Sequence, residues 1–102
     1  MIPLRIAAIA YAMALWALLA SPSLRADLVI GQAADQSGFY GDATRDYIAG
    51  ARTWFDFVNS QGGVRGQKIV LRIHDDGGSP DRTAELTRKL LEEEKADVLF
   101  GF

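Results

Sequence analysis

The feature that most constrains the fold is an alternation of short apolar runs with amphipathic segments between residues 27 and 102. Strand-like runs occupy Leu28–Ala34, Gln67–His74 and Val98–Phe100. The first and third are short and apolar, whereas the second alternates apolar with polar side chains, so all three are expected to be β-strands. Each connection can hold a helix, and such crossovers are right-handed. The pattern predicts an α/β fold, an open parallel sheet with helices on both faces.

Two segments between these runs have the spacing of amphipathic helices. The first has apolar side chains every three or four residues, at Tyr47, Ile48, Ala51, Trp54, Phe55 and Val58. Gly62–Gly63 is expected to end it, because glycine adopts a left-handed conformation without a Cβ penalty. The second helix is predicted over Thr83–Glu94, after Ser79 as N-cap and Pro80 at the first helical position. Its buried side is expected to hold Ala84, Leu86, Leu90 and Leu91.

The first 26 residues do not share this pattern. Arg5 supplies a positive charge, Ile6–Ala20 is continuously apolar, Ser21–Ser23 breaks the run, and Ala26 is small. A charged start, a short apolar core and a small-residue exit predict a secretory signal peptide over residues 1–26 and a periplasmic destination. The apolar run is also shorter than the roughly 20 residues that a bilayer-spanning helix needs. Cleavage after Ser23 and an uncleaved membrane anchor are the alternatives.

Removal of residues 1–26 leaves an acidic chain. Arg5 and Arg25 lie in the removed part, so nine lysine and arginine residues remain against 13 aspartate and glutamate residues, a net charge of −4. This balance argues against a nucleic-acid partner, whose phosphates favour a basic face. It also offers no polybasic patch for a membrane, so membrane contact is expected only through the signal peptide. The absence of cysteine excludes disulfides and thiol chemistry.

Residues 27–102 are expected to be the N-terminal part of a larger domain. A three-stranded parallel sheet buries little surface and leaves open edges. A chain of this length is also near the lower limit for a self-sufficient core. A complete small domain is the alternative.

The loop after the first strand is the best candidate for a binding site. In open α/β sheets ligands bind outside the carboxyl ends of the strands, where the strand order reverses. With the order 2-1-3, this crevice is expected between the loops after the first and third strands. Ser37 and Gly38 offer a hydroxyl and an accessible backbone to a small anionic group, with a helix N-terminus behind them. Phe39 and Tyr40 would form an apolar wall. A simple turn with packing aromatics is the alternative, and Asp42 is expected to cap the helix.

Other motifs are assigned structural roles. Gly62–Gly66 leads from a helix to a strand, whereas a phosphate-binding loop leads from a strand to a helix. Asp75–Asp76 is expected to form a turn away from the crevice, with a metal or phospho-acceptor pair as the alternative. His74, the single histidine, is expected to be a half-exposed strand residue. The sequence contains no nucleophile–base–acid set, so no catalytic residue, metal or cofactor is predicted.

An ordered series of motifs between residues 27 and 102 resembles one known family. The series comprises Ser37-Gly38, Gly50-Ala51, Val58-Asn59, Gly62-Gly63-Val64-Arg65-Gly66, Ile69-Val70-Leu71, Asp75-Asp76-Gly77, Pro80 and Leu99-Phe100-Gly101. In this order and spacing it resembles the leucine/isoleucine/valine-binding proteins of branched-chain amino acid ABC transporters, which are type 1 periplasmic binding proteins. Phe39 is a departure, since family members often have proline there.

The resemblance implies a two-lobed protein that closes around a small ligand, such as a branched-chain amino acid, an amide, urea or an aromatic acid. It implies that the loop with Ser37 and Gly38 forms part of the first lobe's wall. The loop after the third strand, which begins with Gly101 and Phe102, would grip the ligand's carboxylate and ammonium. The implied partner is an ABC transporter permease. A ligand-sensing receptor on the same fold and an exported enzyme on a flavodoxin-like sheet are the alternatives.

Overall fold

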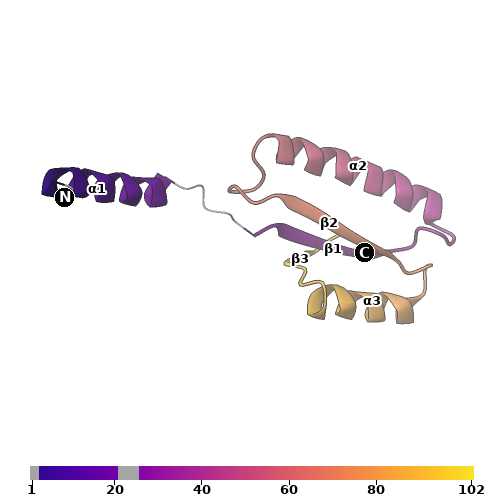
Figure 1. Ribbon diagram of the computed structural model, residues 1–102. Coiled ribbons are helices and arrows are strands. Elements are labelled where there is room, and N and C mark those ends of the chain that lie inside the picture. Colours follow the sequence, from indigo (N-terminus) through magenta and orange to yellow (C-terminus); the bar gives the residue numbers. More distant parts are fainter. Residues whose placement is uncertain (1–2, 21–25) are drawn as a thin grey trace.

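The computed structural model describes residues 3–20 and 26–102. The elements are α1 (Leu4–Ala20), β1 (Leu28–Ala34), α2 (Gly41–Ser60), β2 (Ile69–Asp75), α3 (Pro80–Glu92) and β3 (Val98–Leu99). The strands form one parallel sheet in the order β2-β1-β3. Helices α2 and α3 cover opposite faces of this sheet (Figure 1). The predicted fold class is therefore confirmed, and the strand order is the 2-1-3 order assumed in locating the crevice.

Strand β1 lies at the centre of the sheet. It pairs with β2 over seven residues, from Leu28 opposite Ile69 to Ala34 opposite Asp75. Its last five residues are buried. A Cβ at Gly31 would lie 3.0 Å from the Cβ of Ala96 and 3.2 Å from a methyl group of Leu90, so a larger residue would push α3 and the following loop away from the sheet. Residues 28–34 were predicted as this buried strand.

Helix α2 buries one side of its predicted apolar stripe. Ile48 is buried and Phe55 is partly buried, with its ring 5.9 Å from that of Phe100. Trp54, expected on the same side, is 61 % exposed, and Tyr47 is 49 % exposed. Successive helical residues are separated by about 100°, so Trp54 lies on the flank of the face that Phe55 defines. The predicted burial was therefore wrong for Trp54. For Tyr47 it was partly right, because the ring stacks on Phe100 although the residue is about half exposed.

The segment between α2 and β2 depends on glycine, as predicted for Gly62–Gly63. At Gly63 φ is +75°, and a Cβ would lie 2.0 Å from the carbonyl oxygen of Gln67. Val64 and Gln67 exchange two backbone hydrogen bonds around Arg65 and Gly66, which both have positive φ. This is the backbone of a two-residue hairpin turn. Because the turn includes Gln67, β2 begins at Ile69, two residues later than predicted.

Helix α3 begins at Pro80, the predicted first helical position, and Ser79 is its N-cap as predicted. The Ser79 hydroxyl accepts from the Arg82 amide, and proline provides the first helical φ. The helix ends at Glu92, and Lys95 takes a φ of +56° in the loop that follows. Leu90 is completely buried against the sheet.

The predicted buried side of α3 was partly wrong. Leu86 is partly buried, but Ala84 is exposed and Leu91 is 45 % exposed. Leu90 occupies the space beside Gly31 of β1, and Leu91 lies about 100° further around the helix.

The third strand was predicted over Val98–Phe100, and β3 covers the first two of these residues. Phe100 continues the pairing by donating its amide to the Gly31 carbonyl at 3.0 Å. Within the described ranges, no helix is both long and apolar enough to cross a membrane.

Asn59 joins the end of α2 to the start of β2. Its Nδ2 donates to the Ile69 carbonyl at 2.9 Å, and its Oδ1 accepts from the Ile69 amide at 2.8 Å. The side chain thus completes both backbone groups of Ile69 at the outer edge of β2, where a ladder partner would otherwise be needed.

Replacing Asn59 by alanine is expected to lower the free energy of unfolding by about 2 kcal/mol, because two partly buried hydrogen bonds are lost. Urea unfolding would measure the change. Ser60→Ala, at the adjacent exposed position, is the matched control and should change stability by less than about 0.5 kcal/mol. Equal stabilities for the two variants would contradict the role given to Asn59.

Candidate functional site

Three aspartates meet where β1 and β2 end. Ala34 pairs with Asp75, so the residues that follow these parallel strands emerge side by side. Carboxylate oxygens of Asp35, Asp75 and Asp76 all lie within 4.8 Å of one another. Sequence reasoning placed Asp75–Asp76 away from the crevice, and this was wrong for Asp76, which lines it. The physical reason is the in-register pairing of β1 with β2, which brings their carboxyl ends to one point.

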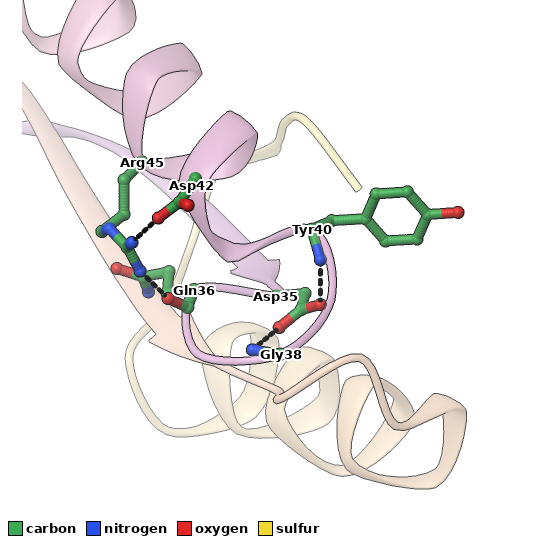
Figure 2. Close-up of polar contacts among 6 residues, drawn as sticks. All are labelled: Asp35, Gln36, Gly38, Tyr40, Asp42 and Arg45. Carbon is green, nitrogen blue, oxygen red and sulfur yellow. Dashed lines mark hydrogen bonds and ion pairs between the residues drawn. The ribbon is translucent and has the colours of Figure 1, made fainter.

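The Asp35 carboxylate shapes the loop after β1. One of its oxygens accepts from the Gly38 amide, and the other accepts from the Tyr40 amide at 3.0 Å. Figure 2 shows both bonds converging on this side chain, with the Tyr40 ring pointing away from the loop. A Cβ at Gly38 would lie 2.6 Å from an Asp35 carboxylate oxygen and 2.8 Å from the Gly77 carbonyl. Close packing therefore requires glycine here, and two amides of the loop are already occupied.

Asp75 ties this loop to the one after β2. Its Oδ1 accepts from the amides of Gln36 at 2.9 Å and Gly77 at 3.0 Å. The Ser37 hydroxyl also donates to this carboxylate and makes the largest contribution to lowering the pKa of Asp75, followed by the two amides. Hydrogen bonds to a carboxylate favour its ionised form. Ser37 therefore has a structural partner, whether or not it also contacts a ligand.

Asp76 is buried and organises the start of α3. Its two carboxylate oxygens accept from the Gly78 amide at 2.9 Å and from the Thr83 hydroxyl at 2.6 Å. Its own amide donates to the Ala34 carbonyl at 3.0 Å. These bonds confirm the turn-forming role predicted for Asp75–Asp76.

Asp42 does not cap α2, contrary to expectation. Tyr40 occupies the N-cap position without a side-chain hydrogen bond, and Asp42 lies in the first turn. Its carboxylate pairs with Arg45, which also donates to the Gln36 carbonyl (Figure 2). The helix begins at Gly41, earlier than a cap at Asp42 would allow. The reason is that the Asp35 carboxylate binds the amides of Gly38 and Tyr40 and so directs the chain into the helix.

A cleft of about 920 Å³ opens at this edge of the sheet. Its lining comprises Ala33, Ala34, Asp35, Tyr40, Ala43, Thr44, Tyr47, Asp76, Gly78, Pro80, Thr83, Ala84, Gly101 and Phe102. All three loops that follow strands contribute, and not only the loops after β1 and β3 as predicted. Tyr40 and Phe102 are thus brought together in one cleft. Ser37, Gly38 and Phe39 are not part of this lining, and Phe39 is 92 % exposed.

The chemistry of the described wall is mainly apolar, with a few polar groups. Three aromatic residues and several small apolar residues line the cleft together with Asp35, Asp76, Thr44 and Thr83. Lining residues of the described ranges include no lysine or arginine. Sequence reasoning missed Thr44, Tyr47 and Thr83, since they lie within helices. The position of each in the first turns of α2 or α3, next to the strand ends, was the available signal.

His74 is partly buried, as predicted for a half-exposed strand residue. Its Nε2 is hydrogen-bonded to the carboxylate of Glu94, which follows α3. The contact links edge strand β2 to the end of the helix that covers the sheet, so it belongs to the packing of the lobe.

Comparison with known proteins agrees with this fold. Residues 27–102 match the family model described as periplasmic binding protein. The chain belongs to this family. The Leu/Ile/Val-binding protein BraC3 of Rhizobium johnstonii is 35 % identical over 74 residues, which cover 70 % of this chain and 19 % of the relative.

Solved structures of two solute-binding proteins have a similar fold. A solute-binding protein of R. palustris in complex with benzoate is 37 % identical, with a TM-score of 0.62 and coverage of 74 % of this chain and 20 % of that one. The substrate-binding protein LivJ of Streptococcus pneumoniae, in complex with isoleucine, has a TM-score of 0.70 at 24 % identity and covers 74 % of this chain and 22 % of that one. The chain therefore spans about a fifth of the length of these relatives.

Asp75→Asn is expected to make stability less sensitive to acid. The folded-state pKa of Asp75 lies below its ordinary value of 3.8, so its stabilising effect is present above that value and is lost as pH falls through the lower folded-state pKa. Asparagine keeps the size of the side chain but does not titrate. Melting temperatures measured from pH 7 down to pH 2 should fall less steeply below about pH 4 in the variant than in the parent protein.

Asp56→Asn, on the exposed side of α2, controls for the removal of one surface carboxylate. A parent-like acid profile in Asp75→Asn would show that the hydrogen bonds of Asp75 do not couple protonation to folding.

Proposed function

We propose that this chain is the first part of the substrate-binding component of an ABC transporter, which captures a small solute in the periplasm. The observation that carries the proposal is the cleft of about 920 Å³ at the carboxyl ends of the strands, in a chain of the periplasmic binding protein family. Small-molecule sites in open α/β sheets occur at this place. The mechanism is binding and closure of two lobes rather than catalysis, in keeping with the family.

The proposed ligand is a branched-chain amino acid or a similar small solute. The relative from Rhizobium johnstonii is named a Leu/Ile/Val-binding protein, and the solved relative from R. palustris holds benzoate. Both ligands combine an apolar body with a carboxylate. The described wall suits the apolar body, since Tyr40, Tyr47 and Phe102 line it. The partner that receives the solute is an ABC transporter permease.

Residues 1–26 are proposed to be the signal peptide that directs export. Helix α1 is apolar on all sides, and its large side chains Leu4, Ile6, Ile9, Tyr11, Met13, Leu15 and Trp16 are exposed. A helix of this kind suits an apolar environment such as the export machinery or the lipid rather than the surface of a globular lobe. Cleavage is proposed after Ala26, directly before the family match that begins at residue 27, and residues 21–25, which include the alternative point after Ser23, lie outside the described residues.

Tyr40→Ala is expected to weaken ligand affinity by about 1–2 kcal/mol in the full two-lobed protein, because a ring that lines the cleft is removed. Isothermal titration with leucine, isoleucine, valine and benzoate would identify the ligand and measure the loss. Phe39→Ala is the matched control, since this neighbouring ring is almost fully exposed and outside the lining.

A larger loss for Phe39→Ala than for Tyr40→Ala would favour the sequence-based assignment of Phe39 to the site over the geometric one. If the parent protein binds none of the four probes, the proposed ligand class is wrong.

Expression of the full gene in a Gram-negative host is expected to yield a periplasmic protein whose first residue is Asp27. Mass spectrometry of the purified N-terminus would test this. Leu15→Arg, which interrupts the apolar core, should retain the precursor in the cytoplasm, because the export signal depends on that core. An intact Met1 on periplasm-facing protein would support the uncleaved anchor instead.

A further inference from the structure

One buried residue of the central strand is polar. Gln32 has no exposed surface, although its neighbours on the same face of β1, Ile30 and Ala34, are apolar. Strands that are covered on both faces are usually continuously apolar. Burial of an amide costs free energy unless its polar atoms find partners. Gln32 therefore calls for an explanation that packing alone does not supply.

The hydrogen bonding of Gln32 is one-sided. Its Nε2 donates to the carbonyl oxygen of Gly101 at 2.8 Å. Its Oε1 is buried and accepts from no group in the described part of the chain. The reverse orientation of the amide would place two oxygens against each other, so the donor must face Gly101. One half of the amide is used to hold a single carbonyl, and the other half is a cost to the fold.

The held carbonyl belongs to the turn that leads from β3 into the cleft. Gly101 has a φ of +68°, which favours glycine. A Cβ there would lie 2.6 Å from Gln32 Nε2 and 2.9 Å from a ring carbon of Tyr47. The backbone at Gly101 thus lies close to both the Gln32 amide and the Tyr47 ring, just before Phe102. Tyr47, Gly101 and Phe102 all line the cleft.

We propose that Gln32 is a positioning residue, which holds the loop after β3 in the place where it forms the ligand-binding wall, at a cost to the stability of the lobe. The proposal rests on the solute-binding function proposed above. Gln32 does not line the cleft, so it acts through Gly101. An apolar side chain of the same length would fill the space without the cost of a buried amide, but it would leave the Gly101 carbonyl unheld.

The test uses Gln32→Met in the full two-lobed protein. Methionine matches the length of glutamine and removes both polar atoms. The variant is expected to melt at the same temperature as the parent or higher. Hydrogen exchange in the peptide containing Gly101 and Phe102 should be about tenfold faster, and the dissociation constant for a probe that the parent binds, among leucine, isoleucine, valine and benzoate, should rise about tenfold, as for the loss of one hydrogen bond.

Ile69→Val is the control, because Ile69 is buried on β2, on the other side of β1 from β3. It should lower the melting temperature and leave both the exchange at Gly101–Phe102 and the affinity unchanged. The two variants are thus expected to show opposite patterns, which a purely structural role for Gln32 would not produce.

A fall in melting temperature for Gln32→Met as large as that for Ile69→Val would overturn the proposal, as would unchanged exchange or unchanged affinity. If the parent protein binds none of the probes, the solute-binding proposal fails in its ligand class. The exchange and melting of the ligand-free variants then still decide whether Gln32 positions the loop.

Discussion

The parallel pairing of β1 on both of its edges is the constraint on which the rest of the lobe depends. β2 and β3 pair with opposite edges of β1, and α2 and α3 cover opposite faces. The last five residues of this strand are therefore buried. Gly31 shows the consequence, because the close approach of Leu90 and Ala96 leaves no room for a Cβ. The two-sided burial leaves β1 little room for larger side chains.

Because the strands are parallel, their carboxyl ends meet at one edge, and the loops there have no ladder to satisfy their backbone groups. Asp35, Asp75 and Asp76 supply the missing acceptors by binding backbone amides of the same or the neighbouring loop. Buried or crowded amides need such partners. The acidic cluster thus keeps the loops after β1 and β2 in a defined shape beside the cleft. A preorganised wall of this kind reduces the ordering cost of binding.

The side chains that line the described wall of the cleft have two different roles. Rings and small apolar groups make the surface, whereas the polar side chains nearest to them mostly hold the loops in place. Ser37 illustrates this, since its hydroxyl donates a hydrogen bond to the Asp75 carboxylate. In a protein of which this chain spans about a fifth, the other wall would supply the remaining ligand contacts. Under the proposed function, closure of a second lobe completes the site.

The sequence by itself determined the class of fold and the alternation of strands and helices, and it predicted both ends of β1. Apolar periodicity, Ser79-Pro80 and Gly62–Gly63 are local signals, and they were sufficient because they depend on backbone geometry over a few residues. The sequence also predicted a site at the loop after β1, of whose predicted residues only Tyr40 lines the cleft. The predicted start of β2 was wrong because Gln67 pairs with Val64 in a hairpin turn instead of joining the strand.

Only the tertiary structure decided which side chains share the cleft. The seven-residue register of β1 with β2 brings Asp76 beside Asp35, and this register is invisible in either segment alone. The packing of α2 on the sheet set the flank on which Trp54 lies. The packing of the turn after β3 beside β1 placed the Gly101 carbonyl within hydrogen-bonding distance of the Gln32 amide, 69 residues earlier in the chain. Contacts of that separation depend on how whole elements pack, which local sequence patterns do not encode.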